Sequence, residues 1–221
     1  MSGLTRSLKY ATFRAGRVIG TCFLMAAAFV LYFALLDGVR FTPQNLLPRF
    51  PYMLMLVGNL MFMIYGMLDV ATYTQLTLTY GCTRKNAALS TVYMHLLQIL
   101  AIEVVMGICC AVIPAQWYAM DGKTLCLLAL IVFLFGSGLA LIAGMLIHRF
   151  GKTAYIVVVI IASLSGGVIG GLVGFHGGTT IVMDIVLGLL NLPVLIAVGV
   201  LWYAVAAVIF WLTIRKIEVR V

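Results

Sequence analysis

The sequence predicts an all-α polytopic membrane protein with six transmembrane helices and both termini in the cytoplasm. Of its 221 residues, 64% are hydrophobic and only 9% are charged, whereas a soluble domain has about 45–50% apolar and about 25% charged residues. The apolar residues form runs near the roughly 20 residues that a helix needs to cross a bilayer. The Lys and Arg residues gather between these runs. A water-soluble enzyme or binding domain is therefore excluded.

The chain is expected to form one transmembrane domain over residues 1–221. Residues 1–17 are predicted to be a basic, amphipathic cytoplasmic segment, residues 18–214 a six-helix bundle, and residues 215–221 a cytoplasmic tail. The spans are predicted at 18–36, 52–71, 87–113, 124–147, 153–175 and 194–214. Residues 181–192 are apolar but too few to cross the bilayer, so we expect an outer re-entrant helix between spans five and six. The first apolar run lacks a signal-peptide cleavage pattern and is expected to be retained.

The distribution of positive charge predicts the orientation. With both termini inside, eleven of the fourteen Lys and Arg residues fall on the cytoplasmic side, and only Arg40, Arg49 and Lys123 fall outside. Positive residues in short loops mark the cytoplasmic side of a membrane protein. We therefore expect a multi-pass protein of the cell membrane, with the bacterial plasma membrane as its location and the lipid bilayer as a partner. The net charge of +8 is explained as a topology signal, so nucleic acid is not expected as a partner.

Motifs for nucleotide binding or catalysis are absent from the sequence. Two Gly-Lys-Thr tripeptides begin at Gly122 and Gly151, but Trp117 and Leu146 stand where a phosphate-binding loop has its first glycine. The five cysteines show no CxxC spacing, which leaves zinc and redox motifs unsupported. We expect no catalytic residue, no metal site and no cofactor in this chain.

Polar residues in the third span form one candidate site. His95, Gln98 and Glu103 make a stripe about 140° wide on a helix of 3.6 residues per turn. Such residues are costly in lipid, so the stripe is expected to face protein or water. It is interpreted either as a substrate path or gating contact, or as an interhelical hydrogen bond. Asp69, near the inner end of the second span, is interpreted as an interfacial anchor.

A glycine tract in the fifth span is the second candidate. Small residues spaced four apart let two helices approach closely. The tract is therefore interpreted as a packing surface, within the chain or across a dimer, with a flexible hinge as the alternative. Its members are Gly166, Gly167, Gly170, Gly171 and Gly174.

The loop before the third span is the third candidate. Thr83 is predicted to cap a helix ahead of Arg84, Lys85 and Asn86. The flanking apolar residues favour a short helix on the inner membrane surface, on which a peripheral partner could act.

The run Tyr80-Gly81-Cys82-Thr83-Arg84-Lys85, followed by Asn86-Ala87-Ala88-Leu89, resembles the loop between the second and third spans of ABC-2-type transporter permeases. The closest likeness is to the small bacterial members that pair with a separate ATPase. The resemblance implies that Thr83, Arg84, Lys85 and Asn86 contact the ATPase, and that residues 2–17 form the family's amphipathic N-terminal helix. It also implies two ATPase subunits, which bind ATP and Mg, and a second permease copy or paralogue. The implied activity is ATP-driven export of an apolar or amphipathic substrate such as a peptide, lipid or drug.

Two rival functions remain open, besides a purely structural or immunity-type membrane protein. A vitamin-binding subunit of an energy-coupling-factor importer has similar size and six spans, and that family presents an AxxxA element in its first span. Here the only candidate, Ala11 to Ala15, precedes that span. An intramembrane enzyme would need paired catalytic groups, but His95 and Glu103 lie about 12 Å apart along their helix.

Overall fold

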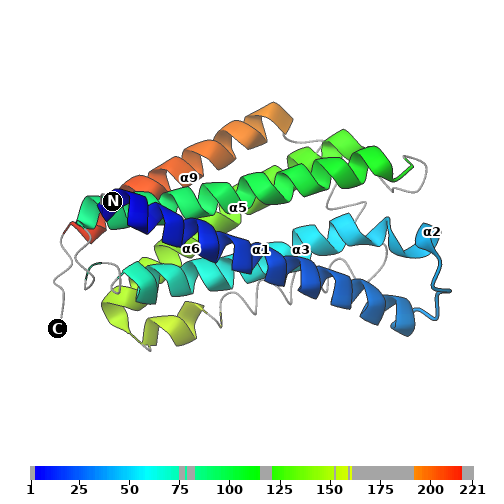
Figure 1. Cartoon of the computed structure of the whole chain (residues 1–221), viewed down its shortest axis with the longest axis horizontal. Coiled ribbons are helices and arrows are strands. Elements are labelled where there is room, and N and C mark those ends of the chain that lie inside the picture. Colours follow the sequence, from blue (N-terminus) through cyan, green and yellow to red (C-terminus); the bar gives the residue numbers. More distant parts are fainter. Residues whose placement is uncertain are drawn as a thin grey trace.

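The computed structural model describes residues 3–74, 78, 83–114, 121–151, 153–158, 160 and 192–215. All regular elements of these residues are helices (Figure 1). The long ones are α1 (Gly3–Leu36), α3 (Arg49–Leu68), α5 (Arg84–Val112), α6 (Gly122–Phe150) and α9 (Leu192–Ile214). A short α2 (Pro43–Leu46) precedes α3, and a π-helix, η1 (Asp69–Tyr73), follows it.

Five helices of the described residues are long and apolar enough to cross a membrane. The chain is therefore an all-α, multi-pass membrane protein. The ends of α3, α5, α6 and α9 lie within three residues of the predicted spans. Only residues 153–158 and 160 of the predicted fifth span are described, and they are helical. The remainder of that span, its glycine tract and the predicted re-entrant helix lie outside the described residues.

Helix α1 joins the basic N-terminal segment and the first span in one uninterrupted helix of 34 residues. At 1.5 Å per residue it is about 51 Å long, well beyond the roughly 30 Å hydrocarbon core of a bilayer. Its first half is amphipathic, because Ser7, Ala11 and Ala15 are buried on one face while Arg6 and Lys9 are exposed on another.

Helix α6 lies at the centre of the described bundle and packs against α3, α5, α9 and η1. Its buried residues include Leu125, Phe133 and Leu141. Two glycines let α3 and η1 come close to its backbone. A Cβ at Gly136 would overlap the amide of Asn59, and a Cβ at Gly144 would lie 2.5 Å from Cβ of Val70. Small residues are a general device for close helix packing in membranes.

Four helix termini lie at the same end of the bundle (Figure 1). They are the first residues of α1 and α5 and the last residues of α6 and α9. A hydrogen bond ties two of these termini together, because Nη1 of Arg84 donates to the carbonyl of Arg215 at 2.7 Å. We call this the basic end. Its exposed cationic residues are Arg6, Lys9, Arg84, Lys85, Arg149 and Arg215, and Arg17 is exposed further along α1. Helix α2 lies at the opposite end.

Candidate functional site

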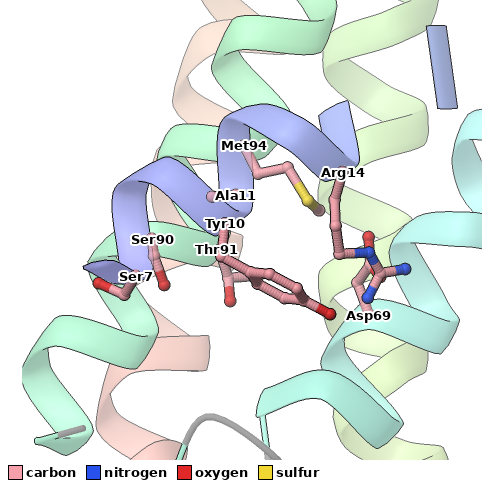
Figure 2. A pocket seen from close by; sticks show the side chains of 8 residues that line it. All are labelled: Ser7, Tyr10, Ala11, Arg14, Asp69, Ser90, Thr91 and Met94. Atoms are coloured by element: carbon pink, nitrogen blue, oxygen red, sulfur yellow. The ribbon is translucent and has the colours of Figure 1, made fainter. Parts of the chain in front are cut away.

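A small polar pocket lies between α1, η1 and α5, towards the basic end (Figure 2). Its volume is about 30 Å³, enough for roughly two water molecules. Six of its lining residues carry polar side chains, and the other two are apolar. The eight are Ser7, Tyr10, Ala11, Arg14, Asp69, Ser90, Thr91 and Met94.

The charged groups of this pocket are Arg14 of α1 and Asp69 of η1, whose side chains form an ion pair. Figure 2 shows the guanidinium reaching across to the carboxylate. Only 13% of the Arg14 side chain and 3% of the Asp69 side chain are exposed. Removing a charge from water is costly, and the attraction within a buried pair offsets that cost only when the partner is present. The pair therefore holds α1 against the end of α3.

The position of Asp69 has a local cause as well. Asp69 is the first residue of η1, where α3 widens from α-helical to π-helical geometry. A π-helical turn inserts one extra residue and is frequent at functional sites. An ionisable residue within a membrane span is costly, so a functional site is the first hypothesis for its presence. The ion pair and the π-helix together make this pocket a candidate site.

The hydroxyl groups around the pair belong to α1 and α5. The hydroxyls of Ser90 and Thr91 donate to the carbonyl of Ala87 at 2.9 and 3.0 Å, and that of Ser7 donates to the carbonyl of Leu4 at 2.9 Å. A hydroxyl oxygen that donates in this way keeps its capacity to accept. The pocket wall therefore offers hydrogen-bond acceptors for water near the ion pair.

The predicted polar stripe of α5 lies at a different place. His95 is fully buried, Gln98 is buried and Glu103 is half-buried. The His95 ring meets the Phe62 ring edge to face, with their centres 5.7 Å apart, and packs against Gly66, where a Cβ would lie 2.9 Å from Cε1 of His95. These contacts place His95 between α5 and α3, in the protein interior.

In the part of the chain that the structure describes, four buried polar atoms of the stripe have no hydrogen-bond partner. Within the described part of the chain, neither ring nitrogen of His95 has a hydrogen-bond partner, and the same holds for Nε2 of Gln98 and Oε1 of Glu103. Each buried polar atom left without a partner costs about 1–3 kcal/mol. The described contacts therefore give the stripe no stabilising role through hydrogen bonding.

The predicted coupling residues lie at the start of α5. Thr83 is the N-cap, and its hydroxyl accepts a hydrogen bond from the backbone N–H of Asn86 at 3.3 Å. Arg84 and Lys85 are exposed, and Asn86 is half-buried. From residue 84 onward, however, these residues form the first turn of the long helix α5 instead of a separate surface helix. Residues 79–82 lie outside the described residues.

Sequence reasoning missed the pairing of Arg14 with Asp69. Asp69 is one of only six acidic residues in the chain, and that scarcity was a signal of a special position. Arg14 follows Ser7 and Ala11 on one helical face at spacings of four and three residues. That face was readable as a contact surface. The glycine tract at 166–174 lies outside the described residues, and the close glycine contacts that are described involve Gly136, Gly138 and Gly144 of α6 and Gly66 of α3.

Among the described residues, His, Cys, Asp and Glu side chains do not gather in groups of three or more that could hold a metal ion. Comparison with models of protein families, with curated proteins and with solved structures finds no match to the chain. The function must therefore be inferred from the residues and their geometry.

Proposed function

We propose that the chain is the permease subunit of an ATP-binding-cassette exporter, which moves an apolar or amphipathic substrate across the bacterial plasma membrane. A second copy or a paralogue would complete the path, and separate subunits would bind ATP and Mg. One observation carries the proposal. Thr83 caps α5 so that Arg84 and Lys85, the basic residues of the motif resembling ABC-2-type permeases, stand exposed at the end of a long apolar helix.

The contacts of α5 provide a route for coupling. Ser90, Thr91 and Met94 follow the exposed turn on the same helix and line the pocket against α1. A partner that displaces Arg84 and Lys85 would therefore act on α1, and on η1 through the ion pair of Arg14. The partner can shift an equilibrium between two arrangements only if it binds them with different affinity. Exposed basic side chains offer such contacts.

The interior of the bundle is compatible with movement. The polar atoms of His95 and Gln98 that lack described partners raise the free energy of this arrangement. A second arrangement of the helices, or a polar group of a passing substrate, would lower it by supplying hydrogen bonds. These atoms therefore favour the interpretation of the stripe as part of a substrate path.

The energy-coupling-factor alternative is less well supported. In such a subunit the AxxxA element must be accessible for docking. Here Ala11 and Ala15 are buried and pack with Met94 of α5. The burial of these alanines weakens the alternative, which then rests on the size of the chain and its predicted six spans.

The test begins with the neighbouring genes, where we expect an ABC ATPase gene. The two proteins are co-expressed, and the complex is purified and assayed for ATP hydrolysis in proteoliposomes. The double variant R84E/K85E should lose co-purification of the ATPase while it still inserts into the membrane. The matched control R40E/K123E reverses two charges at the opposite end and should keep the ATPase bound. An R84E/K85E protein that binds and stimulates the ATPase like the wild type would refute the proposal.

A further inference from the structure

The two ends of the bundle differ in how their charges are compensated. The opposite end has Arg40, Arg49 and Lys123 together with the exposed acids Asp37 and Asp121, and Arg49 pairs with Asp37 at 2.6 Å. The basic end has six exposed cationic side chains and no exposed acidic one among the described residues. Asp69, the described acid nearest to it, is buried and bound to Arg14. Among the described residues, the exposed positive charge of the basic end is thus uncompensated.

Two arginines of this end lie on exposed aromatic rings. The guanidinium carbon of Arg215 is 4.2 Å from the centre of the Trp211 ring, and that of Arg149 is 5.5 Å from the centre of the Phe150 ring. Both rings are exposed. A guanidinium that stacks by its face keeps its N–H groups at the edge, where they match the oxygens of a phosphate. The rings hold the two cations in place without neutralising them.

The apolar surface below Arg215 continues along α9. Exposed apolar side chains recur every three or four residues, so they form one strip that leads from Trp211 towards the middle of the helix. Aromatic side chains at the margin of such a strip are typical of the membrane interface. The strip consists of Leu201, Val205, Val208 and Leu212.

We propose that Arg149 and Arg215, with the rings of Phe150 and Trp211, bind the phosphate groups of anionic phospholipids at the basic end. The acyl chains of a lipid held by Arg215 lie along the exposed strip of α9. Lipid is favoured over a protein partner because an exposed ring and a continuous apolar strip lie directly beside the cation, as a lipid with a charged head and apolar tails requires. The proposal uses the side chains of Arg149 and Arg215, whereas Arg84 binds the backbone carbonyl of Arg215, and it does not depend on the proposed function.

The proposal is tested with purified protein in nanodiscs of phosphatidylcholine, with and without phosphatidylglycerol. Phosphatidylglycerol should raise the melting temperature of the wild type, and native mass spectrometry should show it bound. Each basic residue near an anionic membrane contributes about a fivefold change in binding. The variant R149Q/R215Q should therefore bind phosphatidylglycerol about 25-fold more weakly. The control R40Q/K123Q should bind like the wild type.

Three controls separate lipid binding from misfolding, from charge alone and from binding of free phosphate. In phosphatidylcholine alone, R149Q/R215Q should melt at the wild-type temperature, which shows that it is folded. R149K/R215K keeps the charges but loses the planar stacking, and should fall between the wild type and R149Q/R215Q. Inorganic phosphate at millimolar concentration should give no shift, because it lacks the acyl chains. Wild-type binding by R149Q/R215Q, or an equal shift with inorganic phosphate, would overturn the proposal. The proposal would also be overturned if R149Q/R215Q bound phosphatidylglycerol normally and lost only a co-purifying protein.

Discussion

At the scale of single residues, the ion pair between Arg14 and Asp69 stands out because both groups lie within membrane-spanning helices. A buried pair contributes little net stability compared with apolar residues of similar size, yet losing one partner is strongly destabilising. The pair therefore specifies where α1 meets η1 more than it strengthens the fold. This distinction leads to a test with two variants.

The variant R14A should destabilise the protein by about 3 kcal/mol, because it leaves the carboxylate of Asp69 buried without its cation. The apolar double variant R14M/D69L should recover most of that loss, since it removes both charges and refills the volume. Thermal unfolding in detergent, followed by tryptophan fluorescence, measures both. If R14A unfolds at the wild-type temperature, the ion pair does not hold α1 in place.

The cap of α5 could be predicted from the sequence because it depends on residues three apart, Thr83 and Asn86. The partner of Asp69 could not, because Arg14 lies on another helix and its position follows from how α1 packs on α5. The environment of His95 is a similar case. Its burial follows from the polar stripe, but its contacts with Phe62 and Gly66 depend on the path of α3.

At the scale of elements, α6 organises the described bundle because glycines let its neighbours approach its backbone. The positions of α3, α5, α6 and α9 could be predicted since each is a long apolar run bounded by polar or proline residues. The continuity of α1 could not be predicted from charge alone, because Lys and Arg are good helix formers and do not end a helix. The short α2 and the π-helix η1 left no periodic signal.

The glycines of α6 are expected to be intolerant of a methyl group. G144A places a Cβ 2.5 Å from Cβ of Val70 and 3.0 Å from the carbonyl of Met67, so η1 must move. Such overpacking costs about 1–3 kcal/mol. The matched control is G107A in α5, where a Cβ would have no described atom within 4 Å beyond its own turn of the helix, so stability should not fall. Thermal unfolding of the two variants checks the difference. Equal melting temperatures would show that α6 is not held closely at Gly144.

The first turn of α5 should depend on the hydroxyl of Thr83. T83A removes the acceptor for the N–H of Asn86 and should cost about 1 kcal/mol, whereas T83S keeps it and should cost little. Hydrogen exchange followed by mass spectrometry should show faster exchange at residues 84–88 in T83A only. Faster exchange in both variants would mean that the methyl group of Thr83, and not its cap, maintains the turn.

At the scale of the whole molecule, the structure collects at one end six of the positive residues that the sequence places inside. Arg84 and Arg215 are in contact, and Arg149 ends α6 at the same end of the bundle (Figure 1). This grouping does not depend on any rule about membranes, since it follows from packing alone. The positive-inside rule then predicts that this end faces the cytoplasm.

The orientation can be measured with single added cysteines and a membrane-impermeant maleimide. Q44C lies on exposed α2 at the opposite end, so it should be labelled in intact cells. K9C lies on the exposed face of α1 at the basic end, so it should be labelled only after the membrane is opened. The parent protein, with its five native cysteines, sets the background for both. Labelling of K9C but not of Q44C in intact cells would show that the protein has the opposite orientation. Arg84 and Lys85 would then face away from the cytoplasm, where the proposed ATPase would bind. This one measurement therefore bears on the orientation and on the proposed coupling surface together.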